Sequence, residues 1–396
     1  MTTLSQLRVI RGTQLRHVCF VVYSRANYAR IKTAILACMA HPKLRVSVIV
    51  GASGVLYRYG NVSSLIQKDG INIETELYNA VEGDLPIAMA KTTGLGLIDL
   101  SQEFSRLKPD LVVTVADRFE TISTAIAASY MNIPLVHTQG GELTGSIDES
   151  VRHAISKLAH IHFPATSQAV KVLTQLGEDP EKIFLTGCPS IDIAKNTPTE
   201  SAISVLTRYQ GVGPEINQRE PYLLVSQHPV TTEYQNAGEQ IEETISAIEA
   251  TKMQTVWLWP NMDSGSDSLA KKIRVYREKT SNSRIHFYRN FSAEDYINVM
   301  RGCAVIVGNS SSGIREANFL GIPSVNIGTR QSNREHGANV QFAQCEKKSI
   351  FEAIQLQVEH GTYPSDNIFG DGTAGIKMAE YMAKVDLNVQ KKFYFK

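Results

Sequence analysis

A short run of small and hydroxylated residues has the composition of an anion-binding turn. Residues 308–313 read Gly-Asn-Ser-Ser-Ser-Gly and follow Val305–Val307, an apolar run typical of a buried parallel strand. The run is predicted to turn into an amphipathic helix that ends near Leu320. Free backbone N–H groups and the positive end of the helix dipole meet at such a turn, and Ser310 and Ser311 are small enough to let a phosphate approach.

Two charged residues further along the chain fit the same ligand. Glu316 lies in the first turns of the predicted helix, where its carboxylate can accept hydrogen bonds from ribose hydroxyls. Arg330 follows the next apolar run, Pro323–Ile327. The set suits a nucleotide diphosphate. A turn of glycine and serine between a strand and a helix can also be an ordinary connection in an α/β fold.

Other polar residues follow predicted strands, at the edge where open α/β sheets bind ligands. These candidates are Arg25, Asp117, Arg118, Gln139, Glu142, Asp148, His228 and Asn261. Several have a structural alternative. Arg25 can be a surface charge, Asp117 can cap a helix, and His228 precedes a proline, where a histidine is usually structural.

The segment 138–148 suits neither a helix nor a packed strand. It is polar and rich in glycine, and it carries two carboxylates, Glu142 and Asp148, six residues apart. A helix is predicted over Glu149–Ala159, directly after the segment. A long polar loop at the ligand end of a sheet often holds catalytic groups, so we expect chemistry at this loop.

Strand and helix patterns alternate along the chain in two successive groups, and the first helix is expected over about 29–39. The predicted buried strands are 17–23, 44–50, 111–115, 134–137, 161–164 and 183–186 in the first group, and 222–226, 256–259, 284–287 and 305–307 in the second. This alternation predicts an α/β fold with two doubly wound, Rossmann-like parallel sheets that face each other across a cleft.

The composition excludes several classes of protein. The 396 residues carry 40 basic and 39 acidic side chains, a formal net charge of +1, so neither nucleic acid nor a membrane is expected as a partner. The N-terminus lacks the pattern of a secretory signal and no segment is apolar enough to span a bilayer, which predicts a cytoplasmic protein. The five cysteines contain no C-x-x-C pair, which argues against a disulfide framework and against a zinc site.

Several motifs together resemble one enzyme family. GNSSSGIRE with FLGIPSVNIGTRQ resembles the nucleotide-binding segment of the UDP-N-acetylglucosamine 2-epimerases. Residues 137–160, HTQGGELTGSIDESVRHAISKLAH, are similar over their whole length to the hydrolysing branch of that family, and SRANY resembles the N-terminal loop of that branch. The resemblance spans nearly the whole chain and implies the GT-B type of fold that many glycosyltransferases share.

The resemblance also implies a division of the site. The sugar and the catalytic carboxylates would lie on an N-terminal domain over 1–188, UDP on a C-terminal domain over 189–373, and a helix over 374–396 would cross back to the first domain. The matching nucleotide contacts are Arg25, Arg118, His228 and Asn261, beside Ser310, Ser311, Glu316 and Arg330. Asp117 matches a residue of the sugar pocket, and Asp148 matches a catalytic carboxylate.

One position departs from the pattern. The animal-type members of the family have a glutamate where this chain has Gln139, and an amide cannot transfer a proton. That duty is expected to pass to Glu142, Asp117 or Asp148. Asp267 stands where some members with feedback control have a lysine, so feedback regulation is not expected.

The implied activity is that of a hydrolysing UDP-N-acetylglucosamine 2-epimerase of the sialic-acid-pathway type. It would convert UDP-N-acetylglucosamine and water to N-acetylmannosamine and UDP, without cofactor or metal, as a homodimer or homotetramer. Three alternatives remain open: a hydrolysing epimerase for the UDP-2,4-diacetamido sugar of legionaminic acid pathways, a GT-B glycosyltransferase, and a sugar-nucleotide-binding protein that has lost activity.

Overall fold

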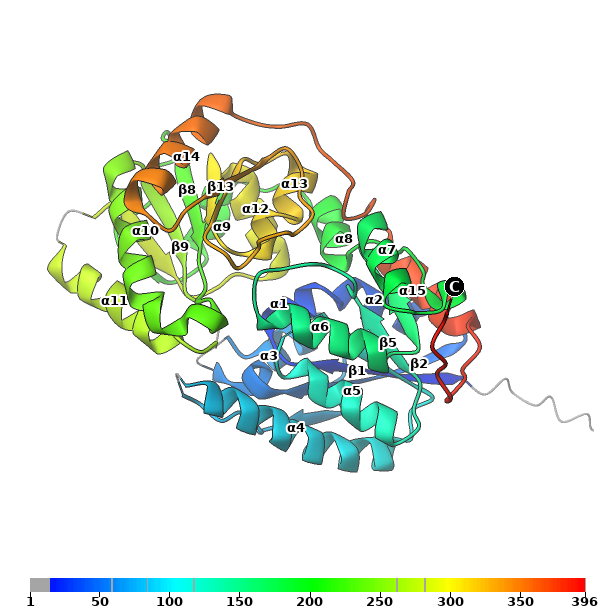
Figure 1. Ribbon diagram of the computed structural model, residues 1–396. Helices are drawn as coiled ribbons and strands as arrows, with labels where there is room; N and C mark the ends of the chain where they lie inside the picture. The colour runs from blue at the N-terminus through cyan, green and yellow to red at the C-terminus, as the bar shows by residue number, and fades with distance from the viewer. Residues whose placement is uncertain are drawn as a thin grey trace, which may run out of the picture.

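The chain folds into two α/β domains, each built on its own mainly parallel sheet (Figure 1). The computed structural model describes residues 15–57, 60–83, 85–116, 118–260, 263–280 and 283–395. Asp117 and Asn261 lie outside the described residues. The sheets show the GT-B arrangement that the sequence predicts, with two doubly wound sheets in succession along the chain.

The first sheet has six strands in the order β3-β2-β1-β4-β5-β6, and all of them are parallel. The strands are β1 (Arg16–Val22), β2 (Leu44–Gly51), β3 (Thr75–Leu77), β4 (Leu111–Val115), β5 (Leu135–Thr138) and β6 (Ile161–Phe163). The strand order reverses between β1 and β4, and a crevice at the carboxyl ends of the strands forms at such a switch point. Arg25 and Arg118 follow these two strands.

The helices of the first half are divided between the two faces of this sheet. They are α1 (Arg25–Ala29), α2 (Lys32–Ala40), α3 (Val62–Lys68), α4 (Pro86–Leu107), α5 (Thr121–Tyr130), α6 (Ile147–Leu158) and α7 (Ser167–Gln175). Successive residues of a strand point to opposite faces, so Phe20 packs in the core formed with α2 and α3, and Val21 in the core formed with α4, α5 and α6. Both faces of β1 are therefore dry.

The second sheet has seven strands in the order β13-β12-β11-β8-β9-β10-β7. The strands are β7 (Gly211–Val212), β8 (Tyr222–Ser226), β9 (Gln254–Leu258), β10 (Ile285–Tyr288), β11 (Val305–Gly308), β12 (Ser324–Ile327) and β13 (Val340–Ala343). All pairs are parallel except β10 with the short edge strand β7. The order reverses at β8 and β11, so the residues that follow these two strands share a crevice.

The helices of the second half surround this sheet, and the last one returns to the first. They are α8 (Pro189–Asn196), α9 (Ala202–Thr207), α10 (Ala237–Thr251), α11 (Ser266–Lys279), α12 (Ala293–Gly302), α13 (Glu316–Leu320), α14 (Lys347–His360) and α15 (Ala374–Lys384). The red helix α15 lies beside α2 (Figure 1), and its buried Met378 and Met382 belong to the core of the first sheet.

Three expectations about local structure are wrong. Ile183–Thr186 makes no strand, because Ile183 forms only an isolated bridge to His162. The helix expected over 29–39 begins earlier and breaks at Arg30, so Arg25 opens the short helix α1. The helix expected after residue 313 is the five-residue α13, which a separate 3₁₀ turn over Ser311–Gly313 precedes.

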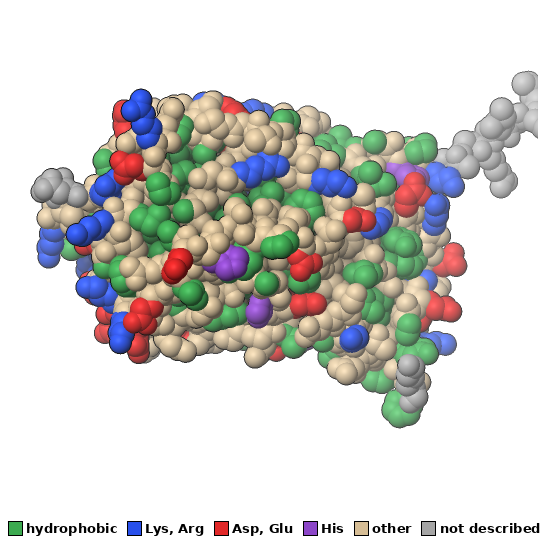
Figure 2. All heavy atoms as spheres, turned by 90° about the horizontal axis from the view of Figure 1, so that it is seen from above, with side chains coloured by type: hydrophobic (Ala, Val, Ile, Leu, Met, Phe, Trp, Pro, Cys, Tyr) green, Lys and Arg blue, Asp and Glu red, His purple; other side chains and the backbone are tan. Residues whose placement is uncertain are grey.

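The described surface carries charges of both signs. Figure 2 shows acidic and basic side chains interspersed over the face seen from above, without a broad field of one sign. Within the described ranges, no helix has the length and apolar character needed to cross a bilayer.

Candidate active site

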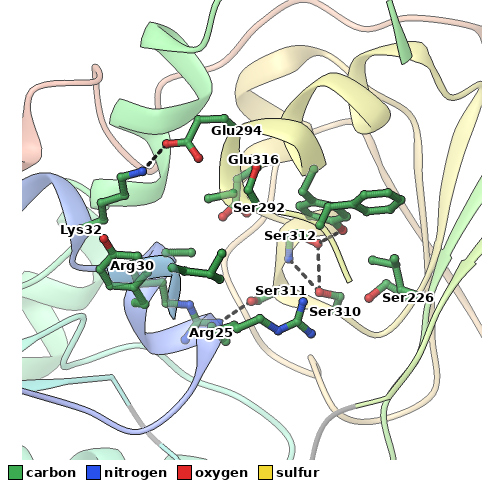
Figure 3. Close-up of a pocket in the computed structure, with 18 of the residues that line it drawn as sticks. Arg25, Arg30, Lys32, Ser226, Ser292, Glu294, Ser310, Ser311, Ser312 and Glu316 are labelled. Atoms are coloured by element: carbon green, nitrogen blue, oxygen red, sulfur yellow. Dashed lines mark hydrogen bonds and ion pairs between the residues drawn. The ribbon is translucent and has the colours of Figure 1, made fainter. Parts of the chain in front are cut away.

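A cavity of about 280 Å³ lies between the carboxyl ends of the two sheets. Side chains of α1 line one wall, and residues that follow β8 and β11 line the other (Figure 3). The lining brings together seven residues that the sequence singles out, namely Arg25, Arg118, His228, Ser310, Ser311, Glu316 and Arg330. Residues far apart in the chain thus meet at one place.

Arg25 enters the cavity without a counter-ion. Ser24 caps α1 by accepting a hydrogen bond from the backbone of Asn27, and this fixes Arg25 as the first helical residue. The Arg25 guanidinium makes no ion pair or hydrogen bond with any described residue. Burial lowers its pKa to about 10, so it stays charged at neutral pH while it is poorly solvated. Such a cation is poised for an anionic ligand.

The serine turn is held by hydroxyl contacts. The Ser310 and Ser312 hydroxyls lie 2.9 Å apart, the Tyr296 hydroxyl lies 2.7 Å from that of Ser312, and the Arg30 guanidinium donates to the Ser311 hydroxyl at 2.5 Å. These contacts connect the turn to α12 and to the first domain.

The positive potential at the turn comes from nearby cations rather than from a helix dipole. Only five residues form α13, and the preceding turn is 3₁₀, so the dipole that the sequence predicts there is small. The nearby guanidinium groups of Arg25, Arg30 and Arg330 supply the positive potential instead. Gly308 serves packing: its φ is +134°, and a Cβ atom there would lie 2.2 Å from the Ser226 carbonyl oxygen.

Glu316 presents a carboxylate oxygen with no partner. The residue opens α13 and lines the cavity. Its Oε2 atom is buried, and no described residue hydrogen-bonds to it. A buried acceptor left unsatisfied is costly, so this oxygen is suited to receive a hydroxyl donor from a ligand.

His228 is held by its backbone and kept neutral. Its N–H donates to Asn309 Oδ1 at 2.8 Å, and its carbonyl oxygen accepts from Asn309 Nδ2 at 2.8 Å. Burial, followed by the positive charge of Arg330, lowers the pKa of His228 to about 3. The imidazole is therefore uncharged at neutral pH and acts as a hydrogen-bonding group.

Arg118 is already surrounded by carboxylates. Its Nε lies 2.7 Å from Glu120 Oε1, and its Nη1 lies 3.0 Å from Asp263 Oδ1 in the second half of the chain. Burial opposes the charge, but these carboxylates raise the pKa of Arg118 above its usual range. Arg118 therefore differs from Arg25, because carboxylates of the protein largely neutralise the charge of Arg118.

Asp148 lies in the first turn of α6, and not in the loop before it. Ser146 caps that helix, and the Asp148 side chain is 18% exposed, with Oδ2 3.8 Å from Arg330 Nη2. This is a contact between the two halves of the chain, and it places a carboxylate beside a cavity-lining arginine.

Glu142, in contrast, is buried in an ion cluster. Arg315 Nη2 lies 2.8 Å from Oε1 and 2.6 Å from Oε2, and Arg334 also donates to Oε2. Burial opposes ionisation, but Arg315 and Arg334 lower the pKa of Glu142 to about 2. A carboxylate so stabilised is a poor proton acceptor at neutral pH, so the hypothesis that Glu142 takes over proton transfer loses its physical basis.

Gln139 lies behind the cavity and is fully buried. It has a φ of +59°, and its Nε2 atom donates to Cys188 Sγ at 3.3 Å. Its Oε1 atom has no hydrogen-bond partner among the described residues. The structure thus shows an amide that contacts the residue preceding α8, and Gln139 is not among the residues that line the cavity.

Two residues of the site escape sequence reasoning. Arg30 lies five residues after Arg25. The single helix expected over 29–39 would have placed Arg30 as an ordinary residue on a helix surface. Asn309 lies inside the glycine and serine turn, and the composition of that turn suggested only hydrogen bonds from backbone N–H groups. No three His, Cys, Asp or Glu side chains within the described ranges are grouped to hold a metal ion.

Comparison with known proteins agrees with this architecture. The model of the UDP-N-acetylglucosamine 2-epimerase family matches residues 36–383. A UDP-N-acetylglucosamine 2-epimerase of Neisseria meningitidis serogroup B is 28% identical over 385 residues, covering 96% of this chain and 99% of the relative. A UDP-N,N'-diacetylbacillosamine 2-epimerase (hydrolyzing) of Legionella pneumophila is 30% identical over 380 residues, covering 95% and 98%.

Solved structures show the same fold. The UDP-GlcNAc 2-epimerase of Neisseria meningitidis bound to UDP-GlcNAc superposes with a TM-score of 0.75 at 19% identity, covering 92% of this chain and 99% of the other. The enzyme of Methanocaldococcus jannaschii in complex with UDP-GlcNAc and UDP gives a TM-score of 0.78 at 16% identity, with the same coverage. From the family match and these likenesses in sequence and fold, the chain belongs to the UDP-N-acetylglucosamine 2-epimerase family.

Proposed function

We propose that this protein is a hydrolysing UDP-N-acetylglucosamine 2-epimerase that releases N-acetylmannosamine and UDP, as in sialic-acid-type sugar synthesis. The observation that carries the proposal is a pair of unsatisfied groups in one cavity, the uncompensated guanidinium of Arg25 and the unpartnered Oε2 of Glu316. A diphosphate and a ribose hydroxyl complement these two groups. A nucleoside diphosphate satisfies both at once.

The nucleotide would lie mainly on the second domain. Glu316 accepts the ribose hydroxyls, while Ser310, Ser311 and the neutral His228 donate to the diphosphate. Arg25 and Arg330 balance its charge. Arg118 completes the nucleotide side, and the sugar points toward Asp148. Asn261 and Asp117 keep the nucleotide and sugar roles that the family resemblance implies. The division into domains at residues 188 and 373 is part of this proposal.

The chemistry is elimination followed by hydration. A carboxylate, Asp148 or Asp117, takes the proton from C2 as the bond between C1 and the UDP oxygen breaks, which leaves a C1–C2 double bond and free UDP. Water then adds its oxygen to C1, and a proton returns to C2 from the opposite face. Arg25 and the hydroxyl donors stabilise the negative charge that develops on the leaving diphosphate.

A second substrate is supported by one comparison. The Legionella pneumophila relative, a hydrolysing epimerase of UDP-N,N'-diacetylbacillosamine, is 30% identical over nearly the full chain. The nucleotide half of the cavity would serve either sugar, so the choice depends on groups around C4 and C6. Parallel assays with the two UDP sugars, each as the sole substrate, decide between them by the ratio of kcat/KM.

Isotopic labelling tests the reaction directly. In D₂O the product N-acetylmannosamine should carry deuterium at C2, and in H₂¹⁸O the label should enter the anomeric oxygen. Label in UDP would mean that the bond to phosphorus breaks, and full retention of protium at C2 would mean that no proton was abstracted. Stable substrate, with transfer only to an added acceptor, would show a glycosyltransferase, and binding without turnover would show a protein that has lost activity.

We also propose a homodimer or homotetramer, in which the outward face of α4 forms a contact between copies. Ile87, Leu95 and Ile98 are 59%, 41% and 56% exposed there. The helix lies at the lower edge of the view in Figure 1, and no other described element lies below it there. A large exposed apolar stripe on a surface helix is typical of a protein interface.

A further inference from the structure

The loop over 139–146 forms a buried junction between the two halves of the chain. Glu142 extends from this loop to Arg315 and Arg334, which flank the nucleotide side. The Gly145 N–H donates to the Arg330 carbonyl oxygen at 3.2 Å, and a Cβ atom on Gly145 would lie 1.9 Å from the Thr329 carbonyl oxygen. The loop therefore fits its counterpart with no room for a side chain.

A chain of hydrogen bonds leads from Glu142 to His228. Arg334 pairs with Glu142 and also donates through Nη1 to Gln331 Oε1 at 2.6 Å. Gln331 Nε2 donates to the Asn309 carbonyl oxygen at 2.9 Å. Asn309 in turn holds the backbone of His228 with two hydrogen bonds of 2.8 Å.

The members of this chain are shielded from solvent. Glu142, Arg334, Gln331 and Asn309 are 6%, 4%, 2% and 2% exposed, and His228 is 8% exposed. Buried polar groups that satisfy one another have few alternative arrangements, so a displacement at one end is passed along. At the other end, the Glu142 carbonyl oxygen accepts from Arg152 of α6, the helix that carries Asp148.

We propose that Glu142 is a positioning residue of the epimerase site. From the sugar-side domain it sets the geometry of Asn309 and His228 on the nucleotide side. It also holds α6 in a fixed position relative to these two residues. The inference rests on the proposed function, because it assigns UDP to the cavity beside His228. Glu142 touches neither the sugar nor the nucleotide in this scheme, and its permanent negative charge is the property that matters.

Loss of that charge should weaken nucleotide binding from a distance. In Glu142→Gln the shape is kept, but Arg315 and Arg334 lose their carboxylate, so Arg334 no longer fixes Gln331. We expect the Kd for UDP, measured by calorimetry, to rise about tenfold. Gln331→Met removes the next link while leaving the ion cluster in place, and it should raise the Kd in the same direction even if Glu142→Gln does not fold.

The double variant separates transmission from local damage. If both residues act through one chain, Glu142→Gln with Gln331→Met should bind UDP no more than about twofold more weakly than the weaker single variant. Multiplied effects would overturn the inference, as would an unchanged Kd in either folded single variant. Glu178→Gln is the matched control, because Glu178 is an equally buried carboxylate held by Lys157, Lys391 and His162 on the far side of the first domain.

The control should lose thermal stability without a change in UDP affinity. A rise in its Kd equal to that of Glu142→Gln would show that any buried charge loss perturbs the site, and the inference would fall. Wild-type protein is measured first with UDP alone. If it does not bind UDP the proposed function fails, whereas wild-type binding with an unaffected Glu142→Gln contradicts only the positioning role.

Discussion

Charged residues in and near the cavity fall into two groups, according to whether the protein already neutralises them. Arg118 and Glu142 face opposite charges at short range, so their main task is to hold elements together. Arg25 and the Oε2 atom of Glu316 lack such compensation from the described residues. A fold tolerates desolvated, uncompensated groups where a ligand will satisfy them. This distinction ranks the candidates in a way that residue type alone does not.

Glu316→Ala should therefore weaken UDP binding strongly. It removes a charge-assisted hydrogen bond worth roughly 1.5–3 kcal/mol, or about ten- to a hundredfold in Kd. Calorimetry with UDP measures the change. The control is Glu294→Ala: its carboxylate lines the same cavity but pairs with Lys32 at 2.5 Å, so a smaller loss of affinity is expected. An unchanged UDP affinity in folded Glu316→Ala would remove this residue from the proposed site.

The departure at Gln139 leads to an ordering of catalytic defects. Asp148→Asn and Asp117→Asn should lower kcat sharply, because each removes a candidate base, while UDP binding survives on the other domain. Gln139→Ala should cost less activity, since the amide cannot shuttle protons and does not line the cavity. Steady-state kinetics with UDP-N-acetylglucosamine measures the order. Near-normal turnover in both aspartate variants would contradict the assignment.

At the scale of elements, the sequence predicted the buried strands well and the polar turns poorly. The strands Leu111–Val115 and Tyr222–Ser226 agree with the structure at both ends, since a continuous apolar run defines each. The short helices α1 and α13 could not be foreseen. Their ends depend on the cap at Ser24 and on a 3₁₀ turn, which tertiary contacts select.

The same limit applies to the site. Position at a strand end was enough to bring Arg25, His228 and Ser310 to one cavity. It could not show that Glu142 points away from the cavity into an arginine cluster, because the two arginines come from a segment more than 170 positions along the chain. Long-range pairing of this kind leaves no local pattern in a sequence.

The C-terminal segment that follows α15 gives a prediction about acid stability. Lys391 donates to the carbonyl oxygens of Ser156 and Lys157 at 2.9 and 2.8 Å and pairs with the buried Glu178. Burial opposes ionisation, but hydrogen bonds from His162 and the lysines lower the pKa of Glu178 to about 2, and burial lowers the pKa of His162. Burial likewise lowers the pKa of Lys391, to about 8, so the contribution of Lys391 to stability changes with pH only in alkaline solution.

The lowered pKa values of Glu178 and His162 change the stability in the same direction. The unfolded chain takes up a proton at His162 below about pH 6.5 and at Glu178 below about pH 4.5, whereas the folded groups resist protonation, so stability falls as pH falls. Lys391→Met should move the midpoint of acid unfolding, followed by circular dichroism, to higher pH, because the buried carboxylate loses a cation. An unchanged midpoint would mean that Lys157 alone compensates Glu178. UDP affinity at neutral pH should not change.

At the scale of the whole molecule, charged contacts cross the cavity between the two sheets, and a small apolar cluster that includes Ala165, Ile191 and Ile314 also joins the two halves. Each sheet has its own hydrophobic clusters on both faces, while the contacts across the cavity include Lys32 with Glu294, Arg118 with Asp263 and Arg330 with Asp148. The more exposed of these contacts, such as that of Lys32 with Glu294, can break and reform in water at modest cost. The buried Glu142 cluster cannot, so any closure of the cavity is expected to pivot there.

The outward face of α4 leads to a prediction about assembly. Gly94 lies between Ile87 and Ile98 on this face, and a Cβ atom there would meet nothing within 4 Å, so a second helix could approach closely. In an antiparallel crossing centred on Leu95, Lys91 of one copy lies beside Asp99 of the other, four residues to either side of the centre. The face is thus complementary to itself, as a two-fold contact requires.

Ile98→Arg should separate the copies, because each copy would place an arginine without a counter-ion in the apolar contact, where it would lose its water. Light scattering should show a halved mass, with an unchanged circular dichroism spectrum. Ile376→Arg is the matched control, since Ile376 is 65% exposed on α15, away from α4, and its mass should equal that of the wild type. A monomeric wild-type protein, or an Ile98→Arg variant that keeps the wild-type mass, would rule out this face as the contact between copies.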